Sequence, residues 1–345
     1  MLVVTSLNDS GTGTLRDTML TAAEDDIITF DSSLSGSIVL ASSLPTITVD
    51  NLLIYGPNSL DISIDGGSLY QIFHIANDQV TIANLNLING ADPALGGAVY
   101  VEAGWNAALT SVNITSCSGA NCASPVYLND SAYINIVNSS FTSGIGPDLY
   151  LVNSSATITN TNSLITSTLQ IDGVGVVETK GPGSVNIQAF STPIDIVIYN
   201  HSGTCQFSGT TDDIVIANGT LMGTFTSYYV ASSGTIQPGD PNTLGTVTSN
   251  GSFVQDTTGN LQIKITPSGT NDLVAITGSL YPEGTLTILP QSGMYIAGTS
   301  YTIITTTQPI DRSFPSILCP ITGFPFSVIY HPNSIEIVIT TSVML

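Results

Sequence analysis

The two stretches GAVYVEAGWNAALTSVNITS (97–116) and SPVYLNDSAYINIVNSSFTS (124–143) repeat one pattern at a spacing of 27. Each stretch places a tyrosine between aliphatic residues near its start. The segments QIFHIAN (71–77) and PDLYLVN (147–153) extend the pattern outward in both directions. An aromatic residue therefore recurs along the chain at spacings of 27, 27 and 23, as Phe73, Tyr100, Tyr127 and Tyr150.

A second series follows the aromatic one in the same register. Its members follow the aromatics at offsets of 11, 11, 11 and 10 and are Asn84, Ser111, Asn138 and Asn160. A repeat of this length, made of short strands and polar turns, is typical of a β-solenoid. We predict an all-β chain that forms a right-handed parallel β-helix with Ile, Val and Leu stacked inside. The Asn and Ser series then lies at a turn, where Asn tolerates left-handed backbone.

The phase of the strands predicts which way the aromatic residues point. Side chains alternate between the two faces of a strand, and the positions that flank the aromatics are almost all aliphatic. The flanking face therefore points inward, with His74 as a core residue, and the aromatics form an outward row: Phe73, Tyr100, Tyr127 and Tyr150. This row is the candidate ligand-binding site, as a stacking platform for a sugar or a partner surface. A packing strip under a loop is the alternative.

The charge of the chain excludes several classes of partner. It has 4 Lys+Arg against 25 Asp+Glu, a net charge of -21, and only 8% charged residues. A protein that binds nucleic acid or anionic lipid needs a basic face, and four scattered cations do not provide one. No apolar run approaches the length of a membrane helix. We expect no nucleic-acid partner and no cofactor.

The cysteines and histidines give weak signals for chemistry. Cys117 and Cys122 lie in CSGANC and predict either a short disulfide loop or two unlinked thiols. The three histidines are far apart in sequence, and no second closely spaced Cys pair exists, so we expect no metal site. The acidic pairs, such as Asp25-Asp26, have no His or Arg motif beside them. We assign no catalytic residue.

The two ends of the chain differ from its middle. Residues 1–36 predict an N-terminal cap with one short amphipathic helix, whose apolar stripe comprises Leu15, Met19, Leu20 and Ala23. Residues 37–240 carry the parallel β-helix. Residues 241–345, the C-terminal β-helix or autochaperone-like segment, alternate more cleanly and contain turns such as Ser268-Gly269-Thr270-Asn271-Asp272, which indicate wider coils or antiparallel hairpins.

Both ends resemble families of bacterial surface proteins. The segment 4–47, VTSLNDSGTGTLRDTMLTAAEDDIITF and onward, resembles the cap of large surface β-helix proteins. The following NLNLINGADPALGGAVY (84–100) is distantly similar to the repeats of chlamydial polymorphic outer-membrane proteins. It carries one GGA[ILV] motif, and the chain lacks FxxN. The segment from Gly234 to Thr340, with GTIQPGDPNTLGTV and GNLQIKITPSGTNDLVAITGSL, resembles the autochaperone-like end of an autotransporter passenger domain.

These resemblances imply a passenger domain of type V secretion, located at the bacterial outer membrane and cell surface or secreted. An outer-membrane β-barrel would follow it in the full-length protein, although residues 1–345 contain no such series of strands. We expect a non-enzymatic adhesin or structural surface protein that binds a host or bacterial receptor or glycan. A polysaccharide lyase or hydrolase and a self-associating aggregation or biofilm factor are the alternatives.

Overall fold

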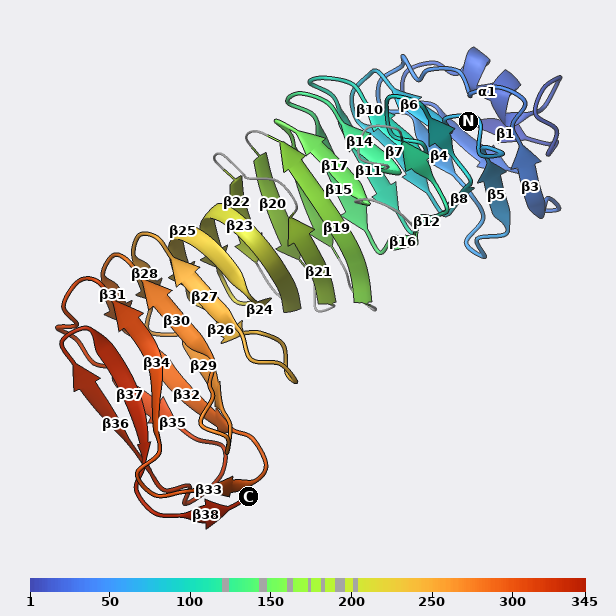
Figure 1. The fold of residues 1–345 in the computed structure, drawn as a ribbon. Coiled ribbons are helices and arrows are strands. Elements are labelled where there is room, and N and C mark those ends of the chain that lie inside the picture. The colour runs from blue at the N-terminus through green and yellow to red at the C-terminus, as the bar shows by residue number, and fades with distance from the viewer. Residues whose placement is uncertain are drawn as a thin grey trace. The chain divides into compact units, whose positions relative to one another are not determined.

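The computed structural model describes residues 1–119, 124–142, 148–159, 164–172, 175–180, 184–189, 196–200 and 204–345. The chain forms two compact units, Met1–Ser191 and Thr192–Leu345. Both are built from stacked coils of short, mainly parallel strands (Figure 1). The only helix in the described part is α1 (Leu15–Thr21). The predicted all-β parallel solenoid is therefore confirmed.

Sheet A of the first unit stacks one strand from each successive coil. Ile54 pairs with Ile82, which pairs with Leu109, which pairs with Ile136, so the residue number advances by 27 or 28 per coil. All pairs of the sheet are parallel. Its strands are β1 (Leu2–Val4), β2 (Ile27–Phe30), β4 (Leu53–Tyr55), β7 (Val80–Ala83), β11 (Asn106–Thr110), β15 (Tyr133–Val137), β18 (Ser155–Thr159) and β20 (Gly175–Lys180).

The coils of the first unit also form two further parallel sheets. Sheet B contains β3 (Gly36–Val39), β5 (Ile62–Asp65), β8 (Asn86–Ile88), β12 (Asn113–Thr115) and β16 (Ser140–Thr142). Sheet C contains β6 (Phe73–Ile75), β10 (Val99–Val101), β14 (Val126–Leu128), β17 (Leu149–Val152), β19 (Leu164–Asp172) and β21 (Ser184–Ala189). A short pair, β9 (Ala91–Asp92) and β13 (Ser118–Gly119), follows sheet B.

Stacked aliphatic side chains fill the inside of the coils. In sheet A one inward position is occupied in six successive coils by residues that are all 0% exposed: Ile28, Ile54, Ile82, Leu109, Ile136 and Ile158. Burial of each such side chain contributes about 1.5–3 kcal/mol. Because every coil repeats the same inward positions, the core is a continuous column, and this holds the register of sheet A.

The predicted turn series is confirmed where the structure describes it. Asn84, Ser111 and Asn138 have positive φ angles of 53°, 53° and 48°. Asn160 lies outside the described residues. The backbone N–H of Asn84 donates to the carbonyl of Thr110 in the next coil (3.0 Å). These left-handed residues end the strands of sheet A and turn the chain toward sheet B.

A ladder of side-chain hydrogen bonds runs across the coils in sheet B. The Nδ2 of Asn113 donates to the Oδ1 of Asn86 (3.0 Å), and the Oγ of Ser140 donates to the Oδ1 of Asn113 (2.7 Å). Amides and hydroxyls can bond in this way at every coil because each supplies both donors and acceptors.

The N-terminal segment contributes both the helix and the first strands of the stacked coils. Strands β1 and β2 are the first two members of sheet A, so the parallel coils begin before residue 37. Thr14 caps α1, since its Oγ1 accepts from the N–H of Asp17 (3.2 Å). Leu15 is 0% exposed, but Leu20 is 68% exposed. The predicted apolar stripe is therefore buried only in part.

The second unit also has parallel coils, which are shorter at first. Cys205 pairs with Leu221 and Leu221 with Ile236, so the residue number advances by only 16 and then 15 per coil, and each coil has two faces. The first face contains β22 (Ile196–Asn200), β23 (Thr204–Ile216), β25 (Phe225–Ser232), β27 (Thr246–Ser249), β28 (Phe253–Gln255), β30 (Leu273–Ile276), β31 (Leu280–Pro282) and β34 (Ser300–Thr306).

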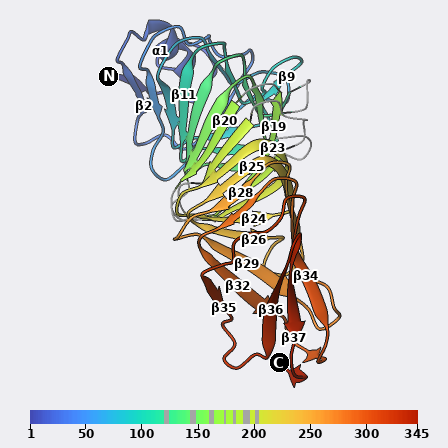
Figure 2. The ribbon, with the colours of Figure 1, turned by 90° about the vertical axis from the view of Figure 1, so that its left-hand side faces the viewer.

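The second face begins with the first residues of β23 and continues in order, as Figure 2 shows, through β24 (Thr220–Gly223), β26 (Thr235–Pro238), β29 (Asn260–Ile265), β32 (Thr285–Pro290) and β35 (Ser316–Leu318). The pairing of β26 with β29 crosses residue 240 without a break. The parallel coils therefore continue into the C-terminal segment 241–345 and become wider there.

Antiparallel strands appear at the end of the second unit. Strand β37 (Ser334–Ile339) pairs antiparallel with both β34 and β36 (Phe326–His331). A second antiparallel pair joins β33 (Met294–Tyr295) to β38 (Val343–Met344). Wider coils and antiparallel hairpins, the two alternatives from the sequence, thus both occur. In the described part of the chain, no helix has the length and apolarity that a membrane-crossing helix needs.

Candidate functional site

The predicted aromatic row exists on the outer face of sheet C, but one member differs. Strand pairing places Tyr100 beside Tyr127, and Tyr127 beside Tyr150. On its other side Tyr100 pairs with His74. The ring centroids are separated by 4.9 Å from His74 to Tyr100, then by 5.5 Å and 5.0 Å along the tyrosines. The aromatic row is therefore His74, Tyr100, Tyr127 and Tyr150.

Phe73 is a core residue and not a member of the row. It pairs with Val99 and is 0% exposed, whereas the His74 side chain is 26% exposed. The sequence prediction aligned Phe73 with Tyr100, whereas the structure pairs His74 with Tyr100. A shift of one residue along a strand exchanges its inward and outward side chains. Between the paired residues His74 and Tyr100 the residue number advances by 26, one fewer than the alignment of the aromatics imposed.

The tyrosines of the row cover one another. The rings of Tyr100 and Tyr127 are stacked with an interplanar angle of 20°, and Tyr100 is only 7% exposed. Its burial raises the pKa of the Tyr100 hydroxyl. The Nδ2 of Asn129 donates to that hydroxyl (3.3 Å). Since ring faces point at neighbouring rings, this geometry agrees better with a packing strip, and ligand binding by the row stays a prediction.

A hydroxyl, an imidazole and a carboxylate lie in line at one end of the row. His74 Nε2 lies 2.7 Å from Glu102 Oε1, and His74 Nδ1 lies 3.3 Å from Thr46 Oγ1. Nucleophilic hydrolases use this order of groups. They also need N–H donors for the oxyanion. The N–H that follows Thr46, that of Ile47, instead donates to the carbonyl of His74 (2.8 Å). The contacts therefore hold the imidazole in one orientation, and the N–H of Ile47 is already used within the coils.

The outer face of sheet A contains a hollow that sequence reasoning missed. It has a volume of about 250 Å³ and is open to solvent. We call it the amide hollow and define it by Asn51, Gln79, Asn106, Ala108, Tyr133 and Asn135. The only signal in the sequence is an alanine at an outward strand position whose neighbours in the adjacent coils, Thr81 and Asn135, are larger.

One polar atom inside the amide hollow has no partner. The Oδ1 of Asn135 is covered and accepts no hydrogen bond from the protein. A buried polar atom without a partner costs about 1–3 kcal/mol.

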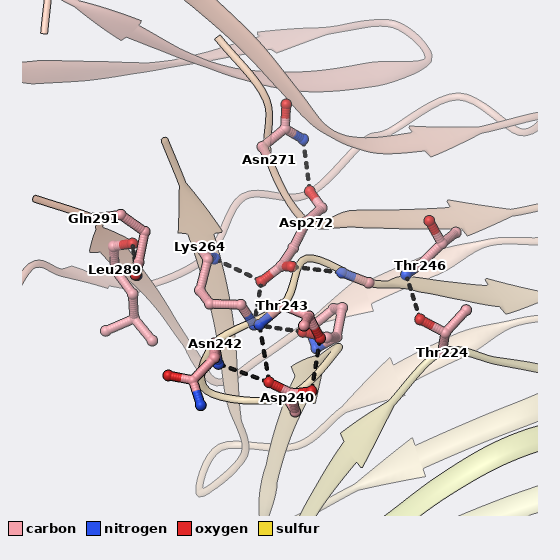
Figure 3. A network of polar contacts seen from close by, with 12 residues as sticks. Thr224, Asp240, Asn242, Thr243, Thr246, Lys264, Asn271, Asp272, Leu289 and Gln291 are labelled. Carbon is pink, nitrogen blue, oxygen red and sulfur yellow. Dashed lines mark hydrogen bonds and ion pairs between the residues drawn. The ribbon is translucent and has the colours of Figure 1, made fainter. Parts of the chain in front are cut away.

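The second unit contains a buried ion pair, shown in Figure 3. Lys264 and Asp272 are 2% and 0% exposed, and Lys264 Nζ lies 3.0 Å from Asp272 Oδ2. The ammonium also donates to the carbonyl of Pro238 (2.6 Å). The carboxylate accepts from the N–H of Lys264 (2.7 Å) and the N–H of Gly245 (2.9 Å).

These contacts give the pair a structural role. Burial raises the pKa of Asp272, while the two N–H donors and the ammonium act in the opposite direction. Lys264 in β29 reaches the last residue of β26, and Asp272 reaches the N–H of Gly245 just before β27. The pair thus ties consecutive coils together beside the Pro238–Asp240 turn. The lone lysine in the strand LQIKITP was visible in the sequence, but its partner in the following turn was not predicted.

Cys117 is a buried thiol. Its residue is 2% exposed, its Sγ accepts from the N–H of Gly90 (3.1 Å), and burial raises its pKa to about 11. In the structure Cys117 is a free cysteine. Its predicted partner Cys122 lies outside the described residues, so the disulfide stays a prediction. Among the described residues, no three His, Cys, Asp or Glu side chains are grouped so as to hold a metal ion.

Comparison with known protein families finds no matching family model, and comparison with curated proteins finds no match.

Proposed function

We propose that this chain is a non-enzymatic binding solenoid that is displayed on a bacterial surface or secreted, and that it binds the surface of a host or neighbouring cell. The observation that carries this proposal is the amide hollow, a concave site on the outer face of a stacked sheet. Four side-chain amides line it and can supply hydrogen-bond donors and acceptors to a ligand. Concave sites with a few convergent polar groups are typical of binding sites.

The location outside the cell rests on the resemblance of residues 4–47 and 234–340 to surface β-helix proteins and autotransporter passengers. The outward ladders of Asn and Ser are compatible with it, since they give the solenoid a polar surface with few charges. The same resemblance is the basis for proposing an outer-membrane β-barrel as a partner within the full-length protein.

A cell-binding experiment tests this function. Beads coated with residues 1–345 are incubated with a panel of bacterial and epithelial cells, and bound beads are counted. Ala108→Trp fills the amide hollow from its floor, while Thr115→Trp places the same side chain on the outer face of sheet B as the matched control. We expect the first variant to lose binding and the second to retain it. Equal binding by both variants, or no binding to any cell, contradicts the proposal.

A further inference from the structure

We propose that the amide hollow binds one pyranose unit of an uncharged glycan. This inference deepens the proposed function, because it names the ligand class of the same site. The hollow, at about 250 Å³, lies below the roughly 300–1,000 Å³ of most small-molecule pockets. It is therefore sized for a single sugar ring at the end or along the side of a glycan, and not for a folded partner segment.

The short side chain of Ala108 forms the floor of the hollow. Along the outer face of sheet A, Ala108 pairs with Thr81 on one side and with Asn135 on the other. Adjacent strands lie about 4.8 Å apart, so one short residue between two longer ones leaves a depression of about two strand spacings. A substitution at Ala108 changes the hollow without changing the core, because its side chain points outward.

The walls supply the hydrogen-bonding groups that sugar hydroxyls need. Four side-chain amides line the hollow, from Asn51, Gln79, Asn106 and Asn135. Each amide offers both a donor and an acceptor, and a pair of neighbouring hydroxyls can engage both at once.

Tyr133 provides an aromatic wall that is already held in place. Its hydroxyl donates to Thr157 Oγ1 (2.8 Å), and that hydroxyl donates to Glu178 Oε2 (3.2 Å). A fixed ring loses little conformational entropy when a ligand binds. Tyrosine also combines an apolar ring, suited to the C–H face of a sugar, with a polar tip.

The charges around the hollow favour an uncharged sugar. Neither Lys nor Arg occurs among the described residues that line it. Two carboxylates lie at its rim and orient the amides: Asp25 Oδ1 accepts from Asn51 Nδ2 (2.5 Å), and Asp78 Oδ1 accepts from Asn106 Nδ2 (2.7 Å). Both carboxylates repel anions. Sialylated, sulfated or uronic-acid glycans are therefore disfavoured relative to neutral hexoses and N-acetylhexosamines.

Glycan binding is measured in two steps. A printed array of neutral, sialylated and sulfated oligosaccharides identifies the best class. Saturation-transfer NMR with the methyl glycosides of glucose, galactose, mannose and N-acetylglucosamine then reports single-ring affinity. A ligand of this size binds with a Kd of about 1 mM. We expect neutral glycans to bind, and we expect the signal of at least one methyl glycoside to saturate.

Three variants connect the binding to the hollow. Asn135→Ala removes the central amide and weakens binding about tenfold, the effect of one lost hydrogen bond. Ala108→Trp abolishes binding, and Thr115→Trp leaves it unchanged. Far-UV circular dichroism and Tm confirm that each variant is folded. If Ala108→Trp lowers Tm, the smaller Ala108→Gln fills the hollow instead and must give the same loss.

The outcomes separate this inference from the proposed function. Preference for anionic glycans, no glycan binding at all, or unchanged binding by Ala108→Trp overturns the glycan site. If cells bind through the hollow but no neutral glycan does, the cell-binding function stands and the glycan inference fails. If neutral glycans bind through the hollow but cells do not, the glycan site stands and the cell-binding function fails.

Discussion

Replacing Lys264 by methionine should loosen the coils around β26 and β29. The substitution removes the ammonium but leaves the Asp272 carboxylate fully covered, and it also removes the donor to the Pro238 carbonyl. Breaking a buried ion pair on one side costs about 3–5 kcal/mol. Asp272 keeps two backbone N–H donors, so we expect the lower end of the range, about 3 kcal/mol.

Hydrogen–deuterium exchange of the second unit measures this cost locally. A loss of about 3 kcal/mol raises the exchange rate of protected amides about 150-fold in peptides that cover 235–238 and 260–265. The double variant Lys264→Met/Asp272→Asn removes both charges and should recover part of the protection. A double-mutant cycle then gives the coupling energy of the pair.

An exposed ion pair in the same unit serves as the control. Arg312 Nη1 lies 3.0 Å from Glu283 Oε1, and their side chains are 49% and 55% exposed. The Arg312→Met variant should cost at most about 1 kcal/mol, since exposed pairs contribute little. If Lys264→Met changes protection by less than tenfold, or no more than Arg312→Met does, then the buried pair does not tie the coils together.

The same variant has a pH dependence whose direction follows from burial. Burial already raises the pKa of Asp272, and the Lys264 ammonium opposes that shift. Without the ammonium the pKa rises further. A raised pKa in the folded state means that the folded protein binds the proton more tightly than the unfolded chain, so stability increases as pH falls. The stability gap between Lys264→Met and wild type should therefore narrow from about pH 7 to about pH 5.

Three further predictions follow from burial and hydrogen bonding. Phe73→Ala should destabilise the first unit by about 3–5 kcal/mol, whereas Tyr127→Ala in the aromatic row should cost about 1.5 kcal/mol or less. Equal losses of unfolding free energy in urea would contradict the assignment of Phe73 to the core. Iodoacetamide at pH 8 should label Cys319 before Cys117, whose pKa is about 11 and whose residue is 2% exposed, and peptide mapping that finds Cys117 labelled first would contradict its burial. Asp256 has its pKa held below 3.8 mainly by the Ser233 hydroxyl, so its ionised form stabilises the fold above that pH and the contribution disappears as pH falls through the lowered pKa; Asp256→Asn should flatten the acid limb of a Tm–pH profile, and an unchanged limb counts against the assignment.

The coil architecture could be predicted from the sequence because it repeats. Every coil must present aliphatic residues to the same column, so the spacing of Tyr100 and Tyr127 and of Ser111 and Asn138 reports the coil length directly. The prediction failed at Phe73, where the coil is shorter by a single position. The alignment there followed the aromatic type of Phe73 and not the alternation of inward and outward positions. Only the pattern of flanking aliphatic residues could have corrected it.

The candidate site was much harder to predict, because its lining residues come from four successive coils. Ala108 is an ordinary outward residue until strand pairing places it between Thr81 and Asn135. The buried ion pair was equally hard to predict, since Lys264 and Asp272 meet across a turn whose course the sequence does not specify. Periodicity predicts which residues stack in one column. It does not predict which columns leave a hollow or which polar side chains are covered by the next turn.

The distribution of charge follows from the stacking. Identical side chains in adjacent coils lie about 4.8 Å apart, where like charges repel. Among the described residues of the first unit, a carboxylate is followed in the next coil by an amide that donates to it in these places: Asp25 with Asn51 (2.5 Å), Asp65 with Asn89 (3.0 Å), Asp78 with Asn106 (2.7 Å) and Asp130 with Asn153 (3.1 Å). The amide does not neutralise the carboxylate, but it donates a hydrogen bond to it at a position where a second carboxylate would repel it. The net charge of -21 is thereby carried in part at the turns and held apart. The residues that line the amide hollow are uncharged, and this is the condition under which an uncharged ligand competes well with water for the same amides.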